Sequence, residues 1–148
     1  MDKKSQPQIP DKVAWEEYDK DLDVKYLHDM FFGKSIDDVQ QYFGGTKSIE
    51  RMDELLFAPR PVFQYYVHAF AKFVMSDKAV GDSDSASPFL SLLEVREKRD
   101  PGSVEEIFES ISEALDFVAS RQEYFDADVN IYDDFRDRAK RIREVCNA

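Results

Sequence analysis

Hydrophobic residues recur at intervals of three and four positions along most of the chain, which is the spacing of one face of an α-helix. In the first part of the chain, this pattern predicts helices over residues 21–33, 35–43 and 48–57. The residues expected to face the core in these helices are Val24, Leu27, Phe31, Ile36, Val39, Phe43, Ile49, Met52, Leu55 and Leu56.

Serine residues mark several of the expected helix starts. Ser35 is followed three positions later by Asp38, and Ser103 by Glu106, which is the spacing of a capping box. Ser48 is the expected start of the third of the helices above. A serine hydroxyl at this position accepts a hydrogen bond from a free backbone N–H of the first turn.

The most apolar stretch is residues 61–76, PVFQYYVHAFAKFVMS. Gln64, His68 and Lys72 interrupt it at intervals of four and therefore form one narrow polar stripe. A helix that is apolar on nearly all sides is usually buried on most sides. This pattern predicts that residues 61–76 form the central helix of the fold.

In the second half of the chain, residues 81–87 have the composition of a loop, and Ser87-Pro88 is the expected start of a helix. Asp100-Pro101-Gly102 predicts a turn, after which helices begin at Ser103 and Asn130. The residues expected to face the core in these helices are Phe89, Leu92, Leu93, Val95 or Arg96, Val104, Ile107, Phe108, Ile111, Ala114, Leu115, Val118, Tyr132, Phe135, Ala139, Ile142 and Cys146.

The predicted fold is therefore all-α, because no pair of strands is indicated. We expect a compact single-domain bundle of about six or seven helices around the central aromatic helix, residues 61–76. Residues 1–12 are polar and contain two prolines, so they are expected to form a flexible N-terminal arm. Residues 13–148 then form the single helical domain.

The composition is that of a folded, strongly acidic protein. Of its 148 residues, 43% are hydrophobic and 14% aromatic, which is enough for a core, and the net charge is −11. This charge argues against binding to nucleic acid or to an anionic membrane, because both need clustered Lys and Arg. It is compatible with a basic protein partner. Homo-oligomerisation is left open.

The negative charge is concentrated between Ser103 and Asp137, where eleven acidic residues stand against two basic ones, Arg121 and Arg136. The last eleven residues are net basic. Acidic residues early and basic residues late in a helical region are favoured by the helix dipole, so part of this asymmetry is structural. The residues that we expect to contact a basic partner are Glu105, Glu109, Glu113, Asp116, Asp133, Asp134 and Asp137.

The chain contains one cysteine, Cys146, so it can form neither an intrachain disulfide nor a cysteine zinc site. The N-terminal sequence lacks the apolar segment of a secretory signal, and no apolar run approaches the roughly 18 residues of a membrane span. These features predict a cytoplasmic protein.

No catalytic motif is present: the chain has no Gly-rich phosphate loop after a strand, no His-Glu-x-x-His and no nucleophile elbow. This weakly disfavours an enzyme, and no cofactor is expected. One alternative is a small-ligand or enzyme site in a helical cavity around His68, lined by Gln64, Tyr65, Tyr66 and Lys72. The same polar row can instead be a hydrogen-bonded contact between helices.

A second alternative is a divalent cation site in DADVNIYDDFRD, residues 126–137. Asp126, Asp128, Asn130 and Asp137 occupy ligand positions one, three, five and twelve of a helix–loop–helix calcium loop. The sixth position, which should be glycine, is Ile131. The same residues are also those of a helix start in which Asn130 caps the last helix and Asp133 is its reciprocal partner.

Taken together, the sequence predicts a non-catalytic acidic helical protein that binds a more basic macromolecule. Proteins of this kind act as regulators, accessory subunits or neutralisers of their partner. The acidic residues between Glu105 and Asp137 are the expected contact surface.

Overall fold

The structure is a computed structural model that describes residues 8–148, and this part of the chain is all-helical, with no strand. It has six helices of ten or more residues and the four-residue helix α6. The helices are α1 (Leu22–Phe31), α2 (Thr46–Phe57), α3 (Arg60–Val74), α4 (Ser83–Arg99), α5 (Phe108–Ala119), α6 (Val129–Tyr132) and α7 (Phe135–Val145). The prediction of an all-α single domain with six or seven helices is confirmed.

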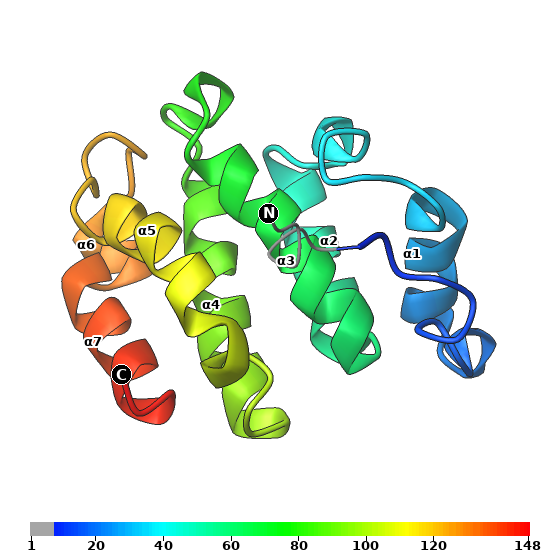
Figure 1. The fold of residues 1–148 in the computed structure, drawn as a ribbon. Helices are drawn as coiled ribbons and strands as arrows, with labels where there is room; N and C mark the ends of the chain where they lie inside the picture. The colour runs from blue at the N-terminus through cyan, green and yellow to red at the C-terminus, as the bar shows by residue number, and fades with distance from the viewer. Residues whose placement is uncertain (1–7) are drawn as a thin grey trace, which may run out of the picture.

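The helices form two rows, which Figure 1 shows from one side. Helices α1, α2, α4 and α7 contact one another in that order, from one end of the molecule to the other. Helices α3 and α5 contact each other and lie in front of this row in the view of Figure 1. Helix α3 also packs against α2 and α4, so it occupies the middle of the fold, as the sequence predicts.

Helix α3 supplies the centre of an aromatic core. Ten of its fifteen residues are buried, and the Tyr66 and Phe70 side chains are fully enclosed. The Tyr66 ring centroid lies 4.7 Å from that of Phe31 in α1, and the Phe70 centroid lies 5.4 Å from that of Phe89 in α4. Aromatic pairs at such separations add to the free energy gained by burying their surface. The aromatic core therefore links α1, α3 and α4.

Arg96 near the end of α4 is buried and bonds to the end of α2. Its Nη1 donates to the carbonyl oxygens of Leu55, Leu56 and Ala58 at 3.2, 3.0 and 2.7 Å. The last carbonyls of a helix have no partner within the helix. Arg96 therefore caps the C-terminus of α2, and its remaining charge is compensated by Asp100, whose carboxylate accepts from Nη2 at 3.2 Å.

Glu97, the next residue, caps the start of the segment that leads into α5. It is 4% exposed, and its carboxylate accepts three backbone hydrogen bonds, from Gly102 at 2.6 Å, Val104 at 2.8 Å and Glu105 at 3.0 Å. These amides open the segment that leads into α5. Two adjacent residues of α4 thus fix the end of α2 and the start of α5.

Asp100 joins these two caps to α3. Its carboxylate accepts from Arg60 Nη2 at 2.6 Å, from the Ser103 hydroxyl at 2.6 Å and from Arg96. The Arg60 and Ser103 hydrogen bonds hold the pKa of the Asp100 carboxyl well below its usual range. Because Ser103 donates to Asp100 and Glu106 bonds to Arg60, the predicted Ser103–Glu106 capping box is wrong.

The predicted helix over residues 35–43 is also wrong, although the Ser35–Asp38 pair forms as expected. Ser35 N donates to Asp38 Oδ2 at 3.0 Å, and Asp38 N donates to the Ser35 hydroxyl at 3.2 Å. The chain continues only as turns and the 3-10 helix Gln40–Tyr42. The Gln40 side chain donates to the carbonyls of Ile36 and Ala69, which ties this segment to α3 in place of a regular helix.

Helices α2 and α4 begin earlier than predicted, and α2 faces the core with different residues. Ser48 and Ser85 are buried where the two helices meet, and their hydroxyl oxygens are 2.7 Å apart. Small side chains permit this close approach, so α4 extends back to Ser83 through most of the predicted loop, and Pro88 lies inside it. Ile49, expected inside, is 38% exposed.

The predicted last helix is interrupted before Asp134. Asp133 has a positive φ of 65°, which ends α6, and the Asp134 carboxylate then accepts from the first amides of α7. Asp128 caps α6 by accepting from Asn130 N at 2.9 Å. The predicted pair of caps, Asn130 and Asp133, is therefore wrong, and Asp128 and Asp134 take these roles.

Residues 1–7 of the predicted flexible arm lie outside the described residues. In the rest of that arm, Pro10 is buried. Over residues 8–148, none of the helices combines the length and the apolar character that crossing a membrane requires.

The Glu97 cap can be tested with Glu97→Gln. The amide has one acceptor oxygen instead of two and places N–H groups against backbone donors, so we expect the free energy of unfolding to fall by about 2–3 kcal/mol. Glu94→Gln is the control, because Glu94 accepts no backbone hydrogen bond and pairs only with the exposed Lys98 and Arg141 side chains, for which we expect a loss of about 1 kcal/mol or less. Urea unfolding gives both values, and equal losses would contradict the capping role.

The Asp100 network predicts a pH dependence of stability. Because the folded-state pKa of Asp100 is depressed, its contribution is fully present above the unfolded-state pKa of about 4 and is lost as the pH falls below it. Asp100→Asn is therefore expected to be less stable than the wild type at neutral pH and to lose less stability on acidification. Parallel unfolding-free-energy profiles for the two proteins below pH ~4 would contradict this.

Candidate functional site

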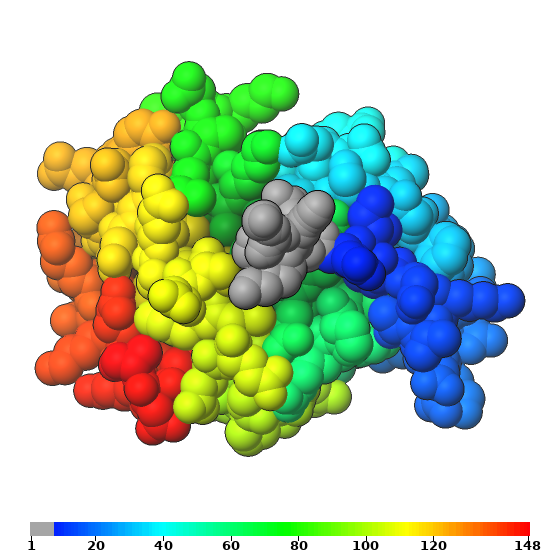
Figure 2. Space-filling view, in the orientation of Figure 1, coloured from blue at the N-terminus to red at the C-terminus, as the bar shows by residue number. Residues whose placement is uncertain are grey.

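The outer face of α5 and its preceding turn carries a row of three glutamates, Glu105, Glu109 and Glu113. Glu109 and Glu113 are four residues apart in α5, which places them on one side of that helix, and Glu105 lies in the 3-10 turn before it. All three are exposed, and none takes part in an ion pair within residues 8–148. We call these three residues the acidic row. Figure 2 shows α5, in yellow, as a large part of the visible surface.

The packing of α5 explains why the acidic row points outward. Ile111, Leu115 and Val118 on the opposite side of the helix are fully buried. The start of the segment is held by Glu97, which accepts from the amides of Val104 and Glu105. A segment that is fixed along its buried side and at its start can rotate little, so the acidic row has a defined orientation.

Asp116, the fourth acidic residue predicted on this surface, is engaged within the molecule. Its carboxylate accepts from Arg143 Nη2 of α7 at 2.5 Å, and the Arg143 guanidinium lies 5.3 Å from the centre of the Phe108 ring. Asp116 therefore helps to hold α5 against α7. An ion pair of this kind near the surface stabilises a protein only modestly.

The other predicted contact residues lie at the α6–α7 corner. Asp134 is half-buried and caps α7 with its carboxylate, whereas Asp133 and Asp137 are exposed. This corner is tied to the end of α5 by Gln122, which donates to the Asp133 carbonyl at 2.8 Å and accepts from Phe135 N at 2.8 Å. The acidic surface predicted from sequence thus consists of two groups, the acidic row and this corner.

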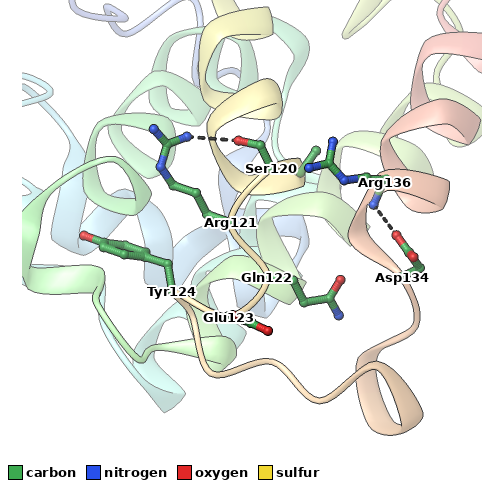
Figure 3. Close-up of a pocket in the computed structure, with 8 residues that line it drawn as sticks. Ser120, Arg121, Gln122, Glu123, Tyr124, Asp134 and Arg136 are labelled. Carbon is green, nitrogen blue, oxygen red and sulfur yellow. Dashed lines mark hydrogen bonds between the residues drawn. The ribbon is translucent and has the colours of Figure 1, made fainter.

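A pocket of about 470 Å³ lies at the C-terminal end of α5, beside the α6–α7 corner (Figure 3). Arg121 and Arg136, the two basic residues of the segment from Ser103 to Asp137, both line it. Arg121 donates to Ser120 Oγ at 3.0 Å, and its guanidinium lies over the Phe117 ring, 3.9 Å from the centroid. The lining includes acidic Glu123 and Asp134, so the pocket does not select one sign of charge.

The polar stripe of α3 forms contacts between elements. The His68 ring nitrogens lie 2.8 Å from the Gln64 carbonyl oxygen and 2.8 Å from the Ser110 hydroxyl of α5. The Gln64 side chain donates to the Ser103 carbonyl at 3.0 Å, and Lys72 is paired with Asp37. Each of the three stripe residues therefore contacts a neighbouring segment.

Tyr65 and Tyr66, predicted beside His68 in the ligand alternative, are both buried. The Tyr66 hydroxyl donates to the carbonyls of Phe31 and Lys34, on the α1 side of α3. Burial raises the pKa of both Tyr65 and Tyr66 above the usual range. The Tyr66 hydroxyl and the His68 ring thus contact different neighbours of α3.

The predicted cation loop does not gather its ligands. Helix α6 occupies its middle, Asp128 caps that helix, and the chain at Asp126 has a positive φ of 56°. Within residues 8–148, no three His, Cys, Asp or Glu side chains are grouped so that they could hold a metal ion. Asp126, Asp128 and Asp137 are therefore not brought together.

Cys146 is buried against the core at the end of α7, as its position in the helical pattern predicts. Burial raises the pKa of its thiol to about 12. The thiolate is the nucleophilic form of cysteine, so this side chain is unreactive at neutral pH.

Sequence reasoning missed two features. The periodicity indicates Val95 or Arg96 as an inward residue, and the structure has Arg96 buried and Val95 exposed. Nothing in the helical pattern indicates that Glu97 is buried, because its partners lie in the segment before α5. A second pocket, near Trp15 and His28, was also missed. The signal available for it was the single tryptophan, which is placed in a stretch with weak helical periodicity.

No protein-family model, curated protein or solved structure matches the chain. Its function is therefore inferred from the side chains described above.

The contact through His68 predicts a stability effect. His68→Ala removes the hydrogen bond to Ser110 that joins α3 to α5, and we expect the free energy of unfolding to fall by about 1 kcal/mol. Lys72→Ala, on the same stripe, is the control, with an expected loss of about 0.5 kcal/mol or less because the Lys72–Asp37 pair is exposed. Denaturant unfolding measures both, and an unchanged value for His68→Ala would show that the contact does not stabilise the fold.

Proposed function

We propose that this protein is a non-catalytic binding protein that uses the acidic row to contact a basic partner, most directly another protein. The observation that supports the proposal is that Glu105, Glu109 and Glu113, in α5 and the turn before it, are exposed and without ion pairs in the described part of the chain.

Folding alone does not favour such a row. Like charges four residues apart in a helix destabilise it by about 0.2–0.5 kcal/mol per pair. The helix dipole favours acids in the first turn, where Glu109 stands, but not further along the helix, at Glu113. A basic partner would offset the repulsion between these glutamates, so the arrangement that is unfavourable in the free protein would favour binding.

The acidic row is also well suited to fast and specific encounter. The whole chain carries a net charge of −11, which attracts a basic partner over a distance of about 10 Å at moderate salt. Because α5 is held along its buried side and by Glu97, little conformational freedom is lost on binding. Charges held in this way favour a partner with a matching arrangement of bases.

The α6–α7 corner extends the proposed contact. Asp133 and Asp137 add exposed negative charge there, while Arg121 and Arg136 add positive charge at the adjoining pocket. A partner that is basic opposite the acidic row and carries both signs of charge opposite this pocket, where Glu123 and Asp134 stand beside the two arginines, would satisfy both. Mixed charge of this kind discriminates against partners that are merely basic.

The proposed biological role is that of a regulator, accessory subunit or neutraliser of the partner. We propose the cytoplasm as the compartment, with which a chain that has a single cysteine and no disulfide is compatible. Pairing of two copies through the acidic row is opposed by their like charge, so any homo-oligomer would use another surface.

The test compares two variants with the same change in net charge. The first carries Glu105→Gln, Glu109→Gln and Glu113→Gln. The control carries Asp53→Asn, Asp77→Asn and Glu144→Gln, three exposed acids of α2, the turn after α3, and α7. Each immobilised protein is incubated with lysate from its native host at low and at high salt, and the retained proteins are quantified by mass spectrometry.

We expect a basic protein that the wild type and the control retain at low salt and release at high salt. The acidic-row variant should bind it about tenfold more weakly, since three exposed ion pairs are lost. Equal weakening in the control would mean that only net charge matters. Retention that is unaffected by salt, or by the acidic-row variant, would contradict the proposal.

A further inference from the structure

Trp15 and His28 each leave a buried ring nitrogen without a hydrogen-bond partner in residues 8–148. Trp15 is only 1% exposed, and its Nε1 can act only as a donor. The His28 Nδ1 lies 3.8 Å from the nearest Asp29 oxygen, which is beyond hydrogen-bond distance. Buried polar atoms are nearly always paired in folded proteins, so two unpaired nitrogens in contacting rings require an explanation.

These two side chains line the same pocket. It has a volume of about 360 Å³ and is lined by Lys12, Trp15, Tyr18, His28 and Phe32. The lining residues come from the turns and the 3-10 helix that precede α1, from α1 and from its C-cap, Phe32. A volume of this size accommodates a small organic molecule.

The walls of the pocket are flat aromatic rings. Tyr18 is stacked on His28 with ring centroids 3.8 Å apart and an interplanar angle of 10°. Phe32 lies 4.8 Å from His28, and Trp15 meets the His28 ring edge-on at 5.1 Å. Flat walls favour a planar ligand, because its faces can make continuous contact with them.

The polar groups of the pocket are hydrogen-bond donors, so a matching ligand carries a hydrogen-bond acceptor. The Trp15 indole and the Lys12 ammonium can only donate hydrogen bonds, and the His28 Nδ1 can also donate. Lys12 contributes the positive charge of the lining. A carboxylate has two oxygens that can accept from two such donors at once and carries the complementary charge.

We propose that this pocket binds a small aromatic carboxylate, with its ring against the aromatic side chains of the lining and its carboxylate facing Trp15 Nε1, His28 Nδ1 and Lys12. The site is independent of the acidic row, because its residues all precede α2.

The single tryptophan provides a direct readout. In ¹⁵N-labelled full-length protein, Trp15 gives the only indole N–H signal, which reports on a new hydrogen bond to Nε1. The probes are benzoate, the neutral benzamide and the cationic benzylammonium, which share the same ring. We expect benzoate to shift the indole signal with saturation, benzamide to bind more weakly, and benzylammonium to cause no shift.

Two variants test the named contacts. Lys12→Gln should weaken benzoate binding about two- to fivefold, the effect of one exposed ion pair, whereas Lys20→Gln, which lies outside the pocket lining, should not. His28→Phe keeps an aromatic ring but removes the Nδ1 donor, so it should also weaken binding. The remaining backbone amide signals verify that each variant is folded.

Several results would overturn the proposal. An indole signal that benzoate does not move, or moves without saturation, would mean that the pocket is not a binding site for this class of ligand. Equal shifts with benzoate and benzylammonium, or equal weakening by Lys12→Gln and Lys20→Gln, would remove the carboxylate from the proposal.

Discussion

Two buried charges on neighbouring residues of α4, Arg96 and Glu97, hold the rest of the structure in place. A buried charge without partners costs several kcal/mol, so both side chains require compensation wherever they are enclosed. Arg96 finds it in the last carbonyls of α2 and in Asp100, and Glu97 finds it in the amides that lead into α5. These two charges can therefore be buried only when the end of α2 and the start of the α5 segment are placed against α4.

This constraint reaches the surface that we propose for partner binding. The amide of Glu105, the first residue of the acidic row, donates to the Glu97 carboxylate, while the Glu105 side chain stays exposed. Behind the row, Ile111 and Leu115 are buried, so the same segment joins a fixed interior to an outward charge. The aromatic pocket near Trp15 is formed by a different part of the chain. Its walls are held in place by the packing of Trp15 against Tyr66 and His28.

The sequence predicts the elements whose structure depends on local periodicity. The inner faces of α1 and α3, including Val24, Leu27 and Phe70, follow from the three- and four-residue spacing of apolar residues. Residues whose environment depends on distant partners could not be predicted. The sequence around Ser85 has the composition of a polar loop, and its helical structure depends on the contact with Ser48 of α2. Likewise, the segment around Gln40 is not a regular helix, and its position depends on the hydrogen bond from the Gln40 side chain to the Ala69 carbonyl.

In the candidate sites, too, features set by local periodicity could be predicted and features set by distant partners could not. The exposure of Glu109 and Glu113 follows from the helical spacing of α5, whereas the structural roles of Asp116 and Asp134 depend on Arg143 and on the break before α7. Periodicity places His68 on a polar stripe, but only the position of α5 determines that Ser110 is its partner.

Amide hydrogen exchange in the full-length native protein tests most directly whether Glu97 fixes the start of the α5 segment. The amides of Gly102, Val104 and Glu105 lie in turns and a 3-10 helix, which ordinarily exchange quickly. Because all three donate to a buried carboxylate, we predict protection close to that of Leu115 in the buried face of α5. Exchange at the rate of an exposed turn would show that the start of α5 opens freely and would contradict the account.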